Sequence, residues 1–350
     1  MNKILTTSAA LLLTTTMAGA GGLDRSGQPI TVIFEKGNYA ELSFGYVMPS
    51  VSGVAFGVDS GNMAPDYSQI AAAAKWDIND RLSFAVIVDQ AFGATVGYPN
   101  PTYPAVGVSI ANLKGVEITA LARYRFSDRF SLHGGARAVQ MSGDVNLSNG
   151  SYVADFANDT DVGFVVGGAY EIPDIALRVA LTYSSETSFS NDTTLFGAPV
   201  APTVYTMPQS VNLDFQTGVA TDTLVFGSIR WADWTATSIS SFGYPANPLV
   251  DYTRDVYTYT LGVGRKFNDR FSGSLAMSYE SSEGVLTSNL DPTDGRFSVQ
   301  IGGSYAVADN VKLSGGVRYI KIGDAVTETI GGVFTDNSAV AIGLKVGYTF

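Results

Sequence analysis

Residues 340–350, VAIGLKVGYTF, show most plainly how this chain folds. Successive side chains of a β-strand point to opposite faces, so every second residue shares a face. One face of this stretch is apolar and carries Val340, Ile342, Leu344, Val346, Tyr348 and Phe350. The other face is small or polar and carries Ala341, Gly343, Lys345, Gly347 and Thr349. The length matches the roughly 9–11 residues that a tilted strand needs to cross a bilayer. The stretch predicts an amphipathic membrane strand; the alternative is an edge strand of a soluble β-sandwich.

The first residues predict export. A short positive region, Met1-Asn2-Lys3, precedes an apolar, Thr-rich stretch over residues 4–17, and Ala18-Gly19-Ala20 has the small-x-small form of a cleavage site. This arrangement is typical of a secretory signal peptide. We therefore expect a signal peptide over residues 1–20 that is cleaved near Ala20, a short N-terminal segment over residues 21–37, and one domain over residues 38–350.

Composition limits the class of protein. The 350 residues are 45% hydrophobic but only 15% charged, whereas soluble domains carry about 25% charged residues. After the signal sequence no run of 18 apolar residues occurs, so we expect no membrane-spanning helix. An exported, charge-poor chain of this kind is either a large soluble β protein or a transmembrane barrel whose apolar residues are diluted by a polar lumen.

Several kinds of site are disfavoured by residue counts. The chain has no Cys, so it has neither disulfides nor thiolate metal sites, and its single His, His133, leaves no multi-His metal site. The net charge of −11 argues against nucleic acid, which needs a basic patch. We expect no metal, no cofactor and no nucleic-acid partner.

Short turns alternate with long loops along the chain. The short turns contain Asn, Asp or Pro, which favour tight reversals, and they lie near 77–81, 125–129, 171–174, 218–222, 266–270 and 306–310. Amphipathic strands are predicted at 38–50, 67–77, 80–94, 114–126, 129–146, 160–171, 174–188, 208–218, 221–237, 252–266, 270–281, 295–306, 310–323 and 338–350. The long loops fall at 51–66, 95–113, 147–159, 189–207, 238–251, 282–294 and 324–337. This alternation predicts an all-β fold, a transmembrane antiparallel β-barrel of about 14 strands.

Aromatic residues gather near the predicted strand ends, as they do at the two membrane interfaces of such barrels. They include Tyr46, Trp76, Tyr124, Phe126, Tyr170, Tyr319 and Tyr348. A soluble sandwich would alternate as well, but its apolar faces would have to pair into one core. The aromatic positions favour the barrel.

The predicted barrel resembles the FadL-type hydrocarbon and fatty-acid transporters of the bacterial outer membrane over the whole mature chain. The matching stretches are Phe34-Glu35-Lys36-Gly37, Gln90-Ala91-Phe92-Gly93, Val179-Ala180-Leu181-Thr182-Tyr183-Ser184-Ser185-Glu186, Pro208-Gln209-Ser210, Trp231-Ala232-Asp233-Trp234 and the terminal Phe350. The resemblance implies a barrel in the bacterial outer membrane with an N-terminal hatch inside it. It also implies transport of hydrophobic compounds, such as long-chain fatty acids, that leave sideways through a kink in strand 3.

The same resemblance assigns roles to particular residues. Gly93 matches the kink position, so Phe92, Gly93 and Ala94 are candidates for a lateral opening; a Gly that only relieves crowding is the alternative. Phe350 is the candidate signal for the barrel assembly machinery. The implied partners are a hydrophobic small molecule, outer-membrane lipids and that machinery.

Two departures from the family pattern affect the expected ligand. The segment before strand 1 is short and has Gln28-Pro29-Ile30 in place of an Asn-Pro-Ala motif, so the hatch is reduced. The family often has Arg where this chain has Ser184, which leaves room for a neutral hydrophobic ligand.

Five cationic or titratable side chains are predicted to face the lumen: His133, Arg137, Arg178, Arg318 and Lys345. They are candidates for holding an anionic head group. The alternative is that they pair with lumenal acids such as Glu117 and Asp214 and hold the interior together.

Two other functions remain open. The first is a general diffusion porin for small polar solutes. The second is an outer-membrane acylhydrolase that uses Ser131 and His133, but residues i and i+2 of a strand are about 7 Å apart, too far for direct proton transfer. No nucleophile motif is visible, so we expect no enzymatic activity.

Overall fold

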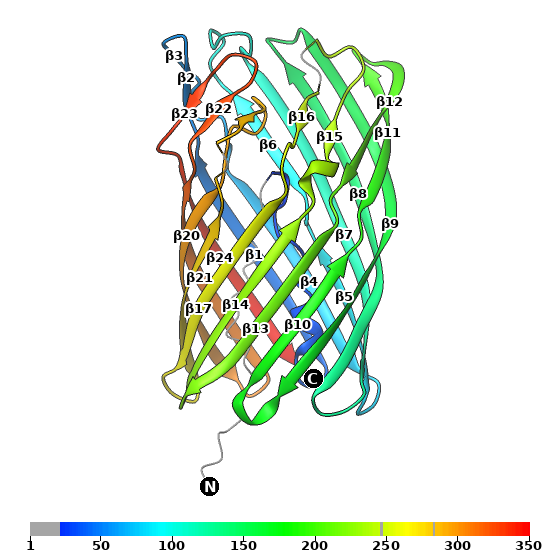
Figure 1. The fold of residues 1–350 in the computed structure, drawn as a ribbon, viewed down its shortest axis with the longest axis vertical. Coiled ribbons are helices and arrows are strands. Elements are labelled where there is room, and N and C mark those ends of the chain that lie inside the picture. Colours follow the sequence, from blue (N-terminus) through cyan, green and yellow to red (C-terminus); the bar gives the residue numbers. More distant parts are fainter. Residues whose placement is uncertain (1–21, 246–247, 283) are drawn as a thin grey trace.

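The computed structural model describes residues 22–245, 248–282 and 284–350. The expected signal peptide and its cleavage near Ala20 lie outside these residues. The described chain forms a closed antiparallel barrel of 14 strands, tall and strongly tilted (Figure 1). The predicted fold class is confirmed. The barrel closes where β1 (Tyr39–Ser50) pairs with both β24 (Ser338–Thr349) and β4 (Tyr67–Asp77).

Most barrel strands run without a break. Besides β1, β4 and β24, these are β7 (Ser109–Arg125), β8 (Phe130–Leu147), β9 (Tyr152–Ile172), β14 (Thr223–Ala232), β17 (Val256–Lys266), β18 (Phe271–Glu280), β20 (Arg296–Ala308) and β21 (Val311–Ile322). The other strands are each divided in two: β5 (Leu82–Asp89) with β6 (Gly93–Tyr98), β10 (Leu177–Ser184) with β11 (Thr187–Leu195), and β12 (Ala198–Met207) with β13 (Ser210–Ala220). The divided strands are the third, seventh and eighth of the barrel.

The two faces of the wall follow the predicted alternation. On β24, Ile342 and Leu344 are exposed on the outside, while Ala341 and Lys345 are buried toward the lumen. Aromatic side chains near the short turns include Trp76, Phe84, Tyr124, Phe130, Phe271, Tyr305 and Tyr348. A second set near the long loops includes Tyr46, Tyr257, Tyr279, Phe297 and Tyr319. The outer surface therefore has an apolar band between two aromatic girdles, as a lipid-facing barrel wall requires.

Two of the predicted outer loops are largely strand. Residues 189–207 were expected as a loop but form most of the β11–β12 hairpin, and β9 begins at Tyr152 inside the expected loop 147–159. Both predictions were wrong because Ser, Thr, Asn and Asp, which usually mark loops, here alternate between buried and exposed positions along extended backbone. The barrel wall consequently rises higher on the side of β8, β9, β11 and β12 (Figure 1).

On the opposite side the wall continues as a small five-stranded sheet. Its strands are β19 (Leu286–Thr287), β22 (Ala325–Thr327), β23 (Val333–Phe334), β2 (Gly53–Ala55) and β3 (Val58–Asp59). Two further short strands, β15 (Ser238–Ile239) and β16 (Val250–Asp251), pair within the outer loops, and the 3-10 helices are η1 (Thr31–Phe34), η2 (Pro173–Ile175) and η3 (Trp234–Ala236). None of the helices in the described parts of the chain has the length and apolar character needed to cross a membrane.

The outer half of the lumen is filled by an apolar cluster from the strands and outer loops. Tyr98 stacks on Tyr103 with ring centroids 5.4 Å apart, and both Trp234 and Phe334, a residue of β23, are completely buried. These buried aromatic side chains give the outer half of the lumen an apolar interior.

Candidate functional site

The N-terminal segment, residues 22–38, is joined to strand 3 where that strand is divided. The backbone amide of Gly93 donates to the carbonyl of Leu23 at 2.8 Å, and the amide of Arg25 donates to the carbonyl of Ala91 at 2.8 Å. Asp24 and Phe92 form an isolated antiparallel bridge between these bonds. The segment therefore acts as a short added strand that satisfies backbone groups left free by the break.

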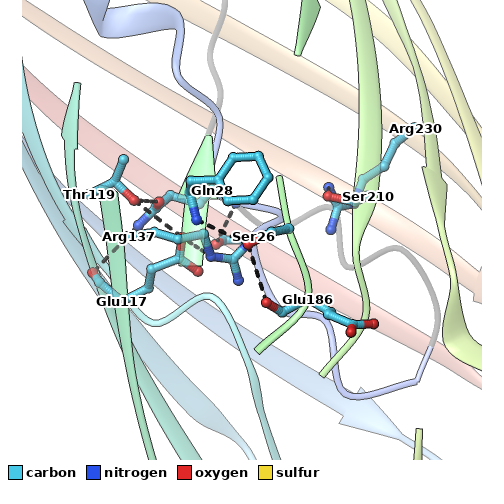
Figure 2. Close-up of polar contacts among 10 residues, drawn as sticks. Ser26, Gln28, Glu117, Thr119, Arg137, Glu186, Ser210 and Arg230 are labelled. Carbon is cyan, nitrogen blue, oxygen red and sulfur yellow. Dashed lines mark hydrogen bonds and ion pairs between the residues drawn. The ribbon is translucent and has the colours of Figure 1, made fainter. Parts of the chain in front are cut away.

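A buried ion pair fixes the same segment to the far wall. The Asp24 side chain is completely buried and its Oδ2 accepts from Arg230 Nη2 at 2.7 Å and Nε at 3.0 Å. Arg230 also donates to Ser210 Oγ at 3.1 Å (Figure 2) and to Asn212 Oδ1 at 3.1 Å. A buried pair with this bidentate geometry holds two elements in one position, and removing one partner would leave an uncompensated charge.

Gln28 joins the segment to the wall formed by β7 and β8. Its Oε1 and Glu117 Oε1 both lie within hydrogen-bond reach of the Thr119 hydroxyl, and Glu117 pairs with Arg137 at 3.2 Å. Figure 2 shows Gln28 between these side chains and Ser26. Arg137 therefore faces the lumen, as predicted, and it pairs with Glu117, one of the two acids predicted as partners.

The ring of Phe34, at the end of η1, is surrounded by cationic and imidazole groups. The guanidinium carbons of Arg123 and Arg178 lie 4.5 Å and 4.6 Å from its centroid, and His133 packs against it edge-on at 5.8 Å. Cation–π contacts of this kind stabilise the position of the ring. Two of the predicted lumen residues, His133 and Arg178, therefore hold the N-terminal segment.

His133 and Ser131 do not form a catalytic pair. His133 Nε2 lies 2.9 Å from Thr182 Oγ1, whereas Ser131 Oγ accepts a hydrogen bond from Arg123 Nε at 3.0 Å. A Ser nucleophile requires its base within hydrogen-bond reach. The arrangement supports the interpretation that these residues stabilise the lumen.

The remaining two candidates also face the lumen. Lys345 pairs with Glu41 at 3.1 Å, and Arg318 donates to Gln300 Oε1. Arg178, Arg318 and Asp214 line a cavity of about 140 Å³ between the N-terminal segment and the wall from β10 to β21. Contact between ligand and any of the five candidates stays a prediction.

The break in strand 3 interrupts the barrel wall. The ladder between β4 and β5 ends at the pair Ala72–Val88, and β6 pairs with β7 but not with residues 67–71 of β4. Gly93 has φ +154°, and a Cβ there would lie 2.9 Å from the carbonyl oxygen of Leu113. Only Gly adopts this backbone without strain, so the kink predicted at Gly93 is present.

Side chains rather than backbone bonds occupy the resulting gap, which we call the strand-3 gap and define by residues 67–71 and 90–95. Gln90 Oε1 accepts from the amide of Ile70 at 3.4 Å. The guanidinium of Arg25 lies 4.2 Å from the centroid of the Tyr67 ring and donates to Gly93 O at 3.0 Å and Thr95 Oγ1 at 3.4 Å. Arg25 therefore closes the gap from the inside.

Behind the gap lies the apolar cluster. Phe92 is buried, and its ring is 6.4 Å from that of Trp234, which packs on Tyr252 at 4.9 Å. Ala94, the third predicted residue of the opening, is partly buried against the same cluster. Phe92 and Arg25 therefore lie at the break, with Phe92 packed on the apolar cluster and Arg25 on Tyr67.

Several solved structures are similar to this chain over nearly its whole length. No protein-family model and no curated protein matches it. A FadL homologue from Pseudomonas aeruginosa superposes with a TM-score of 0.78 at 14% identity, covering 96% of both chains. The toluene transporter TodX of P. putida gives 0.67 at 14% identity over 96% of this chain and 99% of its own. The toluene transporter TbuX of Ralstonia pickettii gives 0.65 at 16% identity over 95% and 97%. The chain therefore has the fold of the FadL-type outer-membrane transporters, as its sequence resemblance predicts.

Proposed function

We propose that this protein carries apolar compounds across the bacterial outer membrane and releases them sideways through the strand-3 gap. The observation that carries the proposal is the break in strand 3 at Gln90–Phe92, where Phe92 packs against the apolar cluster of the lumen. Transport by structurally similar proteins supports it, since two of them are toluene transporters and a third, CymD, is a monoaromatic hydrocarbon channel.

Lateral release follows from the cost of wetting an apolar compound. Removing apolar surface from water is worth about 25 cal/mol per Å², and an aromatic ring buries 150–250 Å². Release of a ring-sized compound from the lumen straight into water would therefore cost roughly 4–6 kcal/mol of free energy. Release into the bilayer avoids this loss, and the break in strand 3 provides the route.

The cargo class is apolar, either a hydrocarbon or a long-chain fatty acid. The lumenal cations Arg137 and Lys345 are paired with Glu117 and Glu41, and Ser184 stands where an arginine would help to hold a carboxylate. These features favour a neutral compound. Because the N-terminal segment and the buried cluster fill the lumen, a gated transporter is also favoured over an open diffusion pore.

Residence in the outer membrane is part of the same proposal. The apolar band and its girdles suit a bilayer, and the sequence begins with the expected signal peptide. Phe350 is exposed and stacks on Tyr348 with centroids 5.8 Å apart. We propose that this pair is presented to the barrel assembly machinery.

Replacement of Arg25 by Ala should increase uptake of labelled toluene several-fold. Arg25 closes the strand-3 gap through a cation–π contact and two hydrogen bonds, each worth about 1 kcal/mol. Arg25→Lys, which keeps the charge but loses the planar fork, should give an intermediate rate. The measurement is the initial rate of uptake in cells with equal amounts of folded barrel. Arg129→Ala, at an exposed turn position, is the control; unchanged uptake in Arg25→Ala would show that Arg25 does not gate the route.

A further inference from the structure

The barrel wall has a second interruption, between β9 and β11. β9 pairs with β10 as far as Val165–Ser184, and then with β11 only over Ala154–Phe156 and Thr193–Leu195. The register is the same in both ladders, so residues 157–163 and 186–192 face each other without ladder pairs. We call this stretch the β9–β11 slot. Each edge also has an irregular register with its other neighbour: β8 and β9 shift between Met141 and Gly143, opposite residues 157–158, and β11 and β12 shift between Asn191 and Thr193.

Side chains bridge the slot where backbone bonds are missing. Asp161 Oδ2 accepts from the amide of Ser188 and Asp159 Oδ2 from the amide of Ser190, both at 2.7 Å. Asn191 Nδ2 donates to the carbonyls of Ala157 at 2.6 Å and Met141 at 2.9 Å. The side chains of Asp159, Asp161 and Asn191 thus take the place of ladder bonds along the slot. The two strand edges can separate there once these three side chains release.

The ladder between the seventh and eighth strands is interrupted at the base of the β11–β12 hairpin. The hairpin bends away from β10 at Ser185–Glu186 and from β13 at Pro208–Gln209, where the ladder between the two strands is interrupted and Pro208 has no amide hydrogen to donate. Figure 1 shows β11 and β12 rising beyond the ends of β10 and β13. On the other edge of the hairpin, Thr237 Oγ1 donates a hydrogen bond to the carbonyl of Thr206 in β12 at 2.8 Å. The hairpin is therefore joined to β10 and β13 through residues that form no ladder pairs with each other.

The inner mouth of the slot contains buried polar groups beside apolar ones. A Cβ at Gly163 would meet Ser185 Oγ at 2.4 Å and both Arg137 Cγ and Thr187 Cγ2 at 3.3 Å, so these side chains converge there. Thr187 is only 1% exposed, yet its Oγ1 and Arg137 Nη2 have no hydrogen-bond partner within the described chain. Phe189 follows on the same face of β11 and is equally buried. Buried polar atoms are nearly always paired with protein, water or ligand.

We propose that the β9–β11 slot is a second side opening, through which apolar compounds bearing one oxygen-containing group enter the lumen. The oxygen accepts hydrogen bonds from Arg137 Nη2 and Thr187 Oγ1, while the apolar body lies against Phe189. The outward residues Phe164 and Val162 are apolar and Thr160 follows them, so the slot begins where the apolar band ends, at the outer-leaflet interface. This inference rests on the proposed transport function and gives it an entrance separate from the strand-3 gap.

A reversible cross-link across the slot tests the opening. The chain has no Cys, so Asp161→Cys with Ser188→Cys supplies the only thiols, joined by a disulfide or a short reducible thiol reagent. The matched control is Ala138→Cys with Val162→Cys, a directly paired position on the other edge of β9. Cells are given labelled toluene or benzyl alcohol before and after cross-linking, and after reduction.

Closing the slot should lower the uptake of both compounds at least fivefold, with recovery on reduction, while the control changes less than twofold. Full uptake with a verified cross-link would overturn the second opening and leave the strand-3 route standing. If the uncross-linked protein takes up neither compound, the proposed function itself fails and the inference with it.

The oxygen-binding part is tested separately by Thr187→Val, which removes one hydroxyl. Uptake of benzyl alcohol relative to toluene should fall about fivefold, while Thr160→Val, on the exposed face of β9, should leave the ratio unchanged. An unchanged ratio in Thr187→Val would show that the mouth of the slot does not bind the hydroxyl.

Discussion

Gly93→Val should reduce uptake of apolar compounds more than tenfold while leaving the barrel folded. Gly93 has φ +154°, and a Cβ would lie 2.9 Å from the oxygen of Leu113 and 3.1 Å from Arg25 Nε. A β-branched residue disfavours this backbone by about 1–3 kcal/mol and favours a regular strand. Strand 3 would then run straight and pair with β4, which closes the gap.

The matched control for this variant is Gly97→Val. Gly97 lies in the same strand segment, but the nearest atom to its Cβ would be Pro65 Cγ at 3.4 Å, an ordinary contact. Uptake of labelled toluene and the heat-modifiable gel mobility of the barrel are measured for both variants. Normal uptake by a correctly folded Gly93→Val barrel would show that transport does not use the strand-3 gap.

Leu344→Arg should destabilise the barrel by about 2–4 kcal/mol if the residue lies near the bilayer midplane. Leu344 is on the outer face of β24 and 52% exposed in the isolated barrel, so in the membrane an arginine there would contact lipid. The measurement is the free energy of unfolding in denaturant titrations of liposome-inserted protein. Gly343→Ser, the neighbouring position on the lumenal face, should cost much less. Equal costs would mean that the faces of β24 are assigned wrongly.

Much of the fold can be predicted from the sequence because alternation in strands such as β24 is strong and local. The main error was the β11–β12 hairpin, whose buried Asn191, Thr193 and Thr203 have the composition of a loop. Their polar groups lie inside the barrel, where other polar side chains surround them. A composition rule cannot separate a polar lumenal strand from a solvent-exposed loop.

The site was predicted less completely than the fold. Gly93 and Phe92 could be placed at the break through resemblance, but Arg25, Tyr67 and the ion pair between Asp24 and Arg230 were missed. Asp24 and Arg230 are separated by more than half of the chain, and strand alternation gives only the face on which a side chain lies. It does not give the partner, which depends on how the N-terminal segment enters the lumen.

The same limit applies to the lumenal cations. Alternation placed His133 and Lys345 on the inner face, yet only the structure shows that His133 packs against Phe34 and Lys345 pairs with Glu41. The sequence of Trp231-Ala232-Asp233-Trp234 matches the FadL-type pattern but does not indicate a role for these residues. Its last residue proves to be the buried aromatic that faces Phe92.

The most direct test of the account is uptake through a barrel whose strand-3 gap is closed covalently. Tyr67→Cys with Thr95→Cys places thiols on the two sides of the gap that Arg25 now bridges, and Ala74→Cys with Val86→Cys provides a directly paired control between β4 and β5. With a short reducible cross-linker, toluene uptake should fall more than tenfold in the first pair, recover on reduction, and stay unchanged in the control. Uptake that continues at the full rate through a verified cross-link would contradict lateral release through the wall.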